Sequence, residues 1–197
     1  MEQRMHPFYR VLEIFSAFFL LNVMWVIVSL PIITLFPATC AMYHTVKGWK
    51  KDGVDPNVWK PFMTGFKKHF RKSFFVGLLG FLAGGLLYLD ITIIYMNEFP
   101  GKTFMFALWA IAALLYLFVL AHLFPVLVNS SEGLFKNLKT ALYLSIGYLD
   151  KTILVLIGAV LMILAVLYVP GLFLVIGSLV AFIHTAFQER FIKVKIQ

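Results

Sequence analysis

Apolar positions along the chain gather into five long blocks that are separated by charged residues and turn formers. The blocks lie at about 11–33, 73–96, 103–128, 152–169 and 172–188. A helix needs roughly 20 apolar residues to cross a hydrocarbon core about 30 Å thick, and these blocks approach or exceed that length. The pattern predicts an all-α fold, a polytopic transmembrane helical bundle of about five spans.

Two short turns join four of these blocks into antiparallel hairpins. Pro100–Gly101 lies between the second and third blocks, and Pro170–Gly171 lies between the fourth and fifth. Such pairs end one helix and let the chain reverse. The prediction is a single membrane domain over 1–197, which divides into a first span at 11–33, an interfacial helix with a basic loop at 39–72, a hairpin at 73–128, a basic amphipathic connection at 129–151, a second hairpin at 152–188 and a tail at 189–197.

The end of the first span contains two prolines. Pro31 and Pro37 break an otherwise apolar stretch, and Thr34 and Thr39 lie beside them. Backbone breaks in a membrane are tolerated where protein or water satisfies the exposed polar groups, and threonine hydroxyls can do this locally. We therefore expect the chain to leave the first span between Pro31 and Thr39 and to bend into an interfacial helix that ends near Trp49. A re-entrant break that lines a cavity is the alternative.

The number of crossings in this region stays open. The apolar run from Val11 to Val46 would be about 54 Å long as one helix, which exceeds the hydrocarbon core. It must therefore break or lie partly in the interface. Five spans follow if Thr39–Trp49 is interfacial. Six spans follow if this segment crosses back, and both termini would then lie on the same side of the membrane.

Positive charge marks one side of the predicted bundle. The segment 44–72 carries eight Lys or Arg residues against two Asp, and both 129–151 and the tail are also basic. Because Lys and Arg accumulate on the cytoplasmic side, we expect these segments and the C-terminus to be cytoplasmic. In a five-span arrangement Arg4 and Arg10 are the exception, since they would lie outside.

A basic amphipathic helix is predicted within the first of these segments. Three phenylalanines recur at every fourth position along one helical face, and four basic residues occupy other faces. These side chains are Phe62, Phe66 and Phe70 on the apolar face, and Lys67, Lys68, Arg71 and Lys72 elsewhere. The basic residues are candidate contacts for anionic lipid headgroups. The phenylalanine face is a candidate contact for a cytoplasmic partner.

Composition supports a membrane assignment. The chain is 61% hydrophobic and 13% charged, with a mean hydropathy of +0.91, which is unlike a soluble domain. The net charge of +8 is explained by topology, so we expect no nucleic-acid partner. No signal-peptide cleavage site follows the N-terminus, and the lone Cys40 excludes an intrachain disulfide.

Enzyme chemistry is not expected from this sequence. It contains no Walker lysine motif, and neither its histidines nor its cysteine have the spacing of a metal site. The five histidines are scattered along the chain. We therefore expect no catalytic residues, no metal and no cofactor.

Polar and small residues inside the apolar blocks are further candidates. Asp90 marks either a partner or ion site, or a solvated position near the outer interface. His122 precedes a proline, which frees a backbone carbonyl that a polar side chain can satisfy. Gly77, Gly80 and Gly84 form a small-residue surface, either for another subunit or for packing within the bundle.

The N-terminal part of the chain also resembles a known family. The stretch Pro31–Thr39, with Trp25 before it and the phenylalanine-rich basic helix after it, is similar to the YesL-like family of small bacterial integral membrane proteins. Phe36 departs from the family pattern, in which glycine is expected before the second proline. The resemblance implies a location in the bacterial cell membrane. It also implies genes beside carbohydrate uptake systems of the ATP-binding-cassette (ABC) type.

This context makes the expected function that of an accessory or regulatory partner of a membrane complex, with an ABC-type carbohydrate importer as the candidate. The alternative is a small solute transporter or channel that works as a homo-oligomer, and a lipid-interacting or structural role also stays open. A carrier should gather polar groups at the midplane on discontinuous helices. The third to fifth blocks show almost none apart from His122, which favours the partner hypothesis.

Overall fold

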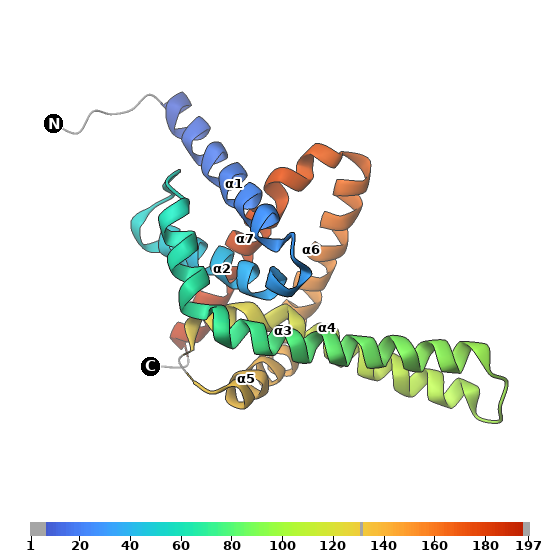
Figure 1. The fold of residues 1–197 in the computed structure, drawn as a ribbon. Coiled ribbons are helices and arrows are strands. Elements are labelled where there is room, and N and C mark those ends of the chain that lie inside the picture. The colour runs from blue at the N-terminus through green and yellow to red at the C-terminus, as the bar shows by residue number, and fades with distance from the viewer. Residues whose placement is uncertain (1–6, 131, 195–197) are drawn as a thin grey trace.

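The computed structural model describes residues 7–130 and 132–194, and within these ranges every regular element is a helix and none is a strand. The elements are α1 (Pro7–Ser29), η1 (Ile32–Thr34), α2 (Leu35–Asp52), α3 (Trp59–Met96), α4 (Lys102–Asn129), α5 (Leu134–Gly147), α6 (Leu149–Tyr168), η2 (Pro170–Leu172) and α7 (Phe173–Val194). Figure 1 shows their arrangement. The predicted all-α class is confirmed.

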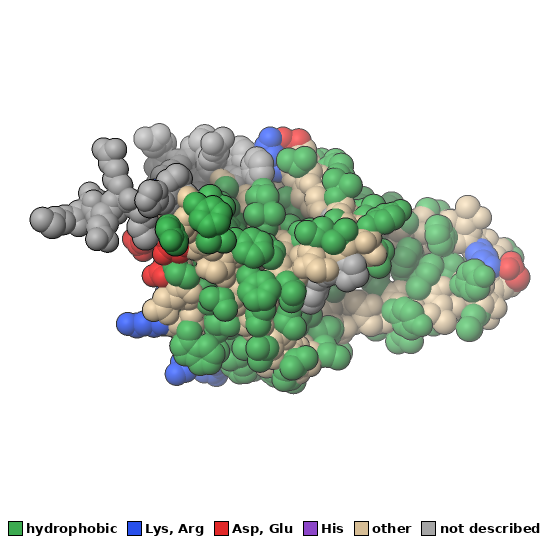
Figure 2. Space-filling view, turned by 90° about the horizontal axis from the view of Figure 1, so that it is seen from above, with side chains coloured by type: hydrophobic (Ala, Val, Ile, Leu, Met, Phe, Trp, Pro, Cys, Tyr) green, Lys and Arg blue, Asp and Glu red, His purple; other side chains and the backbone are tan. Residues whose placement is uncertain are grey.

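Four of the described helices are long and apolar enough to cross a membrane. They are α1 over Phe8–Ser29, together with α3, α4 and α6. The fifth predicted span coincides with α7, whose apolar part, Leu174–Ala186, is shorter than a usual crossing. Figure 2 shows hydrophobic side chains over most of one face, with charged side chains at its edges. The chain is therefore an integral membrane protein.

Helix α2 lies at the centre of the fold. It contacts α1, α3, α4 and α7, and Ala38, Cys40, Ala41 and Val46 along it are fully buried. Small side chains such as these let neighbouring helices approach closely. The helix begins at Leu35 rather than at the expected Thr39. Its predicted place at the membrane interface stays a prediction, but within the chain α2 is the element around which α1, α3, α4 and α7 pack.

The break after the first span is shorter than predicted. Helix α1 ends at Ser29, and Thr34 Oγ1 lies 2.5 Å from the Val28 carbonyl oxygen and 2.7 Å from that of Pro31. This hydroxyl therefore satisfies a carbonyl that the break exposes, as expected for Thr34. Pro37 makes no break, because it lies in the first turn of α2, where a backbone N–H has no intrahelical acceptor.

Helix α3 joins two predicted segments into one. It runs without interruption through the basic amphipathic region and the second apolar block. Its 38 residues make a helix about 57 Å long, which is more than a hydrocarbon core can hold. The basic first part of α3 therefore extends beyond the apolar span that follows it.

The α3–α4 hairpin extends to one side of the bundle, away from α1, α6 and α7 (Figure 1). The positions of the buried residues in the two helices agree with this arrangement. In α3 the buried residues lie between Phe62 and Gly77, apart from Ile94, and in α4 they lie between Phe118 and Val128. We call residues 82–117 the outer hairpin. Within it Ile94 is the one buried residue, so its two helices contact each other and are otherwise largely exposed.

Candidate functional site

Four helices bring polar side chains together in the interior of the bundle. Tyr43 Oη in α2 lies 2.8 Å from His184 Nδ1 in α7. His122 Nε2 in α4 lies 2.9 Å from Thr152 Oγ1 in α6. The two histidine rings meet edge to face, with their centroids 5.7 Å apart. We call Tyr43, His184, His122 and Thr152 the polar chain, and each of the four is less than a tenth exposed.

The polar chain gives His122 a partner on another helix. The expected contact of His122 with a carbonyl that a nearby proline frees stays a prediction, and its Nε2 meets the Thr152 hydroxyl in α6. Thr152 Oγ1 also lies 2.9 Å from the carbonyl oxygen of Ser145 and 3.0 Å from that of Tyr148. These contacts join α4 to the start of α6, so His122 holds two predicted hairpins together.

A cavity of about 210 Å³ lies beside the polar chain. Helices α1, α2, α4 and α7 line it with Asn22, Trp25, Thr39, Met42, Tyr43, Phe124, Gly177, Val180 and Ala181. Trp25 Nε1 donates to Thr39 Oγ1 over 3.0 Å, and that hydroxyl donates to the Leu35 carbonyl over 2.8 Å. Thr39 therefore links α1 to α2 at the cavity wall, instead of sealing a break in the backbone.

The three candidate glycines of α3 face neighbours within the chain. A Cβ atom at Gly77 would lie 2.8 Å from Phe36 Cγ, and one at Gly80 would lie 3.2 Å from Phe36 Cζ. A Cβ atom at Gly84 would lie 3.1 Å from Tyr116 Oη, which donates to the Gly80 carbonyl. These contacts favour packing within the bundle over contact with another subunit. Phe36, the departure from the family pattern, is the side chain that fills the space at two of the glycines.

The phenylalanine face of α3 is divided between the core and the surface. Phe62 is fully buried, Phe66 packs against the core, and Phe70 is exposed. The face predicted for a cytoplasmic partner is therefore smaller than expected, because Phe62 is a core residue. Phe66 and Phe70 remain in contact with each other at its edge, with ring centroids 5.3 Å apart.

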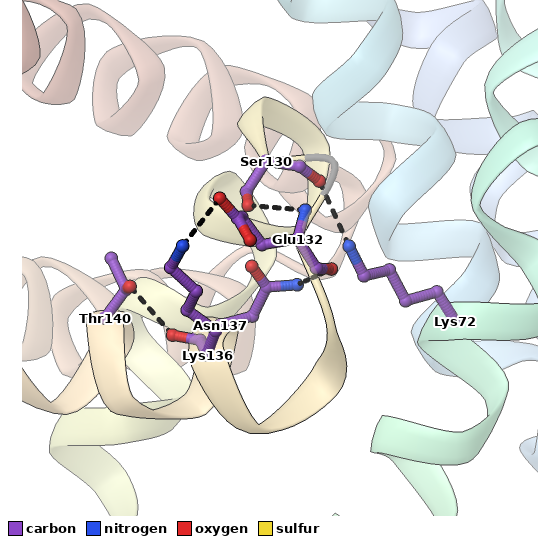
Figure 3. A network of polar contacts seen from close by, with 6 residues as sticks. All are labelled: Lys72, Ser130, Glu132, Lys136, Asn137 and Thr140. Atoms are coloured by element: carbon purple, nitrogen blue, oxygen red, sulfur yellow. Dashed lines mark hydrogen bonds and ion pairs between the residues drawn. The ribbon is translucent and has the colours of Figure 1, made fainter.

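Three of the four basic candidates of α3 are free to meet anionic headgroups. Lys67, Lys68 and Arg71 are exposed, whereas Lys72 Nζ donates to the Ser130 carbonyl over 3.1 Å. Figure 3 shows Lys72 reaching the turn between α4 and α5, where Glu132 pairs with Lys136 over 2.8 Å. Lys72 therefore fixes α3 to that turn.

The cluster of basic residues also acts on a histidine in α2. His44 is half-buried, and its ring centroid lies 5.4 Å from that of His69. Burial lowers the pKa of His44, and the positive charges of Lys68 and Lys47 lower it further. The neutral imidazole is therefore the favoured form at this end of the bundle.

Asp90 lies on the outer hairpin, away from the polar chain. Its side chain is exposed and lines a hollow of about 330 Å³ between α3 and α4. The neighbouring Thr92 Oγ1 donates to the Tyr88 carbonyl over 2.8 Å, within its own helix. In the described part of the chain no group of three or more His, Cys, Asp or Glu side chains could hold a metal ion.

Sequence analysis missed most of the polar chain. The third to fifth blocks were expected to carry almost no polar side chains apart from His122, yet Thr152 and His184 belong to them and are buried. One sequence pattern could have indicated that His184 is buried. The spacing of Gly177, Ala181 and His184 places all three on one face of a helix. The two small residues let α1 and α2 come close, and the histidine follows on the same face.

Comparisons with known proteins agree on one family. A model described as "Protein of unknown function, DUF624" matches residues 18–91. "Uncharacterized protein YesL" of Bacillus subtilis (strain 168) is 30% identical over 169 residues, which are 84% of this chain and 79% of the relative. "Uncharacterized protein YteU" of the same strain is 28% identical over 166 residues, which are 83% of this chain and 74% of the relative. No solved structure matches.

Proposed function

This chain belongs to the YesL-like family of membrane proteins, and from that membership we propose that it is a non-enzymatic accessory or regulatory partner of a membrane complex. One observation carries the proposal. The outer hairpin stands apart from the rest of the bundle, and its long apolar faces have no covering helix among the described residues (Figure 1).

The physics of helix association in lipid supports this use of the outer hairpin. Lipid tails are as apolar as leucine, so membrane helices associate through close packing and polar contacts rather than through the hydrophobic effect. A projecting pair of helices offers such packing surfaces to the helices of another protein. The importer of the ABC type is the candidate complex, because the genetic context implied by the family resemblance places such systems beside these proteins.

The proposal includes an orientation in the bacterial cell membrane. The end of α2 with the start of α3, the segment 129–151 and the C-terminus lie on the cytoplasmic side, since their basic residues follow the positive-inside rule. The turn at the tip of the outer hairpin then lies outside. Exposed Lys67, Lys68 and Arg71 lie where anionic headgroups attract cations.

Co-purification from the native membrane tests the proposal. The tagged chain is extracted in a mild detergent or in nanodiscs, and the proteins recovered with it are quantified by mass spectrometry. We expect permease or ATPase subunits of an importer in amounts stoichiometric with the tagged chain. An unrelated polytopic protein with the same tag and expression level is the control. Recovery of the chain alone, as a monomer or homo-oligomer, would contradict the proposal.

A second candidate function, a small solute carrier or channel, is favoured by the polar side chains and the cavity in the interior of the bundle. The polar chain and the adjoining cavity lie beside a helix break between α1 and α2, and carriers gather polar groups at such breaks. Solute and proton flux into proteoliposomes of the purified protein tests this candidate. Flux that is lost with Tyr43→Phe and His184→Gln, and retained with Tyr143→Phe on the exposed surface of α5, would support a carrier.

A further inference from the structure

We propose that the hollow around Asp90 on the outer hairpin is the docking site for a transmembrane helix of a partner protein that carries a lysine or arginine at the level of Asp90. This inference rests on the proposed partner function and names the chemistry of the contact. The partner's cation pairs with the Asp90 carboxylate, and the stem of its side chain lies along the apolar walls of the hollow.

The hollow is built from both helices of the outer hairpin. Its volume is about 330 Å³, and its walls are Leu87, Asp90, Ile93, Ile94, Phe99, Met105, Leu108, Trp109 and Ala112. The walls are apolar apart from the carboxylate and the indole. A site of this composition suits a side chain with a long apolar stem and a charged end, which describes lysine and arginine.

Nearby donors on the outer hairpin are already committed. Trp109 Nε1, the one donor of that side chain, bonds the Leu87 carbonyl over 2.8 Å. Lys102 Nζ lies 2.6 Å from Glu98 Oε1 at the tip of the hairpin. Across residues 7–130 and 132–194, no hydrogen bond or ion pair reaches the Asp90 carboxylate. The hairpin therefore presents an exposed negative charge without a counterion of its own.

The depth of Asp90 makes this charge costly in lipid. Asp90 follows Lys72, at the basic end of α3, by about 27 Å along the helix, and a hydrocarbon core is about 30 Å thick. Exposed Leu86, Leu89 and Ile93 surround it on the helix surface. A carboxylate just inside the apolar region is stabilised by a cation that reaches it from an adjacent helix. Charge complementarity thus selects a basic helix over an apolar one.

The experiment compares four tagged proteins in the co-purification described above. They are the unaltered chain, Asp90→Asn, Asp90→Glu and Glu98→Gln, and importer subunits recovered per tagged chain are measured for each. Asp90→Asn keeps the shape and removes the charge, so partner recovery should fall about tenfold. Asp90→Glu keeps the charge and should retain most of the recovery. Glu98→Gln alters an acid of the same hairpin that already has Lys102, and should recover the partner fully.

The outcomes separate this inference from the proposed function. If the unaltered chain recovers no partner, both are overturned. If the unaltered chain and Asp90→Asn recover the partner equally, the partner function stands, and Asp90 is only solvated by water or lipid headgroups at the interface. If Asp90→Asn and Glu98→Gln lose the partner equally, the loss reflects net charge, and the docking site is again overturned. Gel-filtration elution and helical circular dichroism of each variant confirm that it is folded.

Discussion

The ring of Phe36 in α2 packs directly against the backbone of Gly77 in α3, where an added Cβ atom would lie 2.8 Å from Phe36 Cγ. The same ring reaches Gly80 one turn further along and contacts Phe81 and Phe124, with centroid distances of 5.6 and 5.3 Å. One side chain thereby fixes the central helix to both helices of the α3–α4 hairpin.

Replacement of Gly77 by alanine should destabilise the protein. The new methyl group meets the part of Phe36 nearest its backbone, which cannot swing away, and such overpacking costs about 1–3 kcal/mol. Gly85→Ala in the same helix is the matched control, because no atom lies within 4 Å of its added Cβ. Alanine there should be neutral or slightly stabilising. Thermal unfolding in detergent measures both, and equal melting temperatures would show that Phe36 does not restrict Gly77.

A double variant tests whether Phe36 is the cause. Shortening the ring with Phe36→Ala opens the space that Gly77→Ala fills, so the two changes should be less destabilising together than the sum of their separate effects. The coupling should be of the order of 1 kcal/mol, as for residues in direct contact. If the two losses of stability are additive, contact with Phe36 is not what destabilises Gly77→Ala.

Gly177 should be restricted in the same way by Asn22. A Cβ atom at Gly177 would lie 2.5 Å from Asn22 Oδ1, the end of that side chain, so in Gly177→Ala the Asn22 amide must rotate or α7 must move away from α1. We expect a loss of stability of about 1 kcal/mol, smaller than at Gly77, and Asn22→Ala should relieve part of it. Gly158→Ala in α6, which has open space around it, is the control. If Gly177→Ala and the control have the same melting temperature, the approach of α1 to α7 is looser than the structure shows.

Removing one hydroxyl tests the polar chain. Tyr43→Phe keeps the ring stacked on Phe124 and leaves His184 Nδ1 without its partner at 2.8 Å. Hydrogen bonds between membrane helices contribute about 1 kcal/mol, so the melting temperature should fall by a few degrees. Tyr143→Phe, on an exposed tyrosine, should change nothing. An unchanged melting temperature for Tyr43→Phe would mean that His184 finds another partner.

Block lengths and turn chemistry were sufficient to predict a helix over each apolar block and the turns that join two pairs of them, because these are local properties. The place of α2 could not be predicted. Its apolar face, with Lys50 and Lys51 beyond it, has the pattern of a helix on a membrane surface, and that pattern is the same when other helices replace lipid. The pair Tyr43 and His184 joins positions 141 apart in sequence, so no local spacing marks it.

His44 should make stability depend on pH. Burial, and then Lys68 and Lys47, lower its pKa in the folded protein, whereas the unfolded chain takes up this proton near pH 6.5. The unfolded state therefore binds more protons below about pH 6.5, and the contribution of His44 to stability is lost as the pH falls from there toward the lowered pKa. Melting curves between about pH 5 and 8 should be flatter for His44→Gln than for the unaltered protein.

Lys68→Gln is the companion variant in this measurement. It removes a positive neighbour of His44 while leaving the ring buried, so the pH-dependent loss should be smaller than in the unaltered protein and larger than in His44→Gln. If all three curves are parallel, other groups govern the acid sensitivity.

Thiol labelling should establish the orientation in the membrane. Cys40 is the one cysteine of the chain; it is buried, and burial raises its thiol pKa to about 12, so its background reactivity should be low. In intact cells a membrane-impermeant maleimide should label Glu98→Cys at the tip of the outer hairpin. Lys51→Cys should be labelled only after permeabilisation, because the proposed orientation has the basic loop on the cytoplasmic side. The reverse pattern would invert the proposed orientation.

A third cysteine decides between five and six crossings. Tyr9 lies exposed near the start of α1, outside the deep part of that span. If α2 is a central helix that does not cross, α1 alone carries the chain from one side to the other, and Tyr9→Cys is labelled in intact cells together with Glu98→Cys. If the α1–η1–α2 segment crosses twice, Tyr9→Cys is protected until the cells are permeabilised. We expect labelling in intact cells, because α2 is too polar to count among the candidate spans.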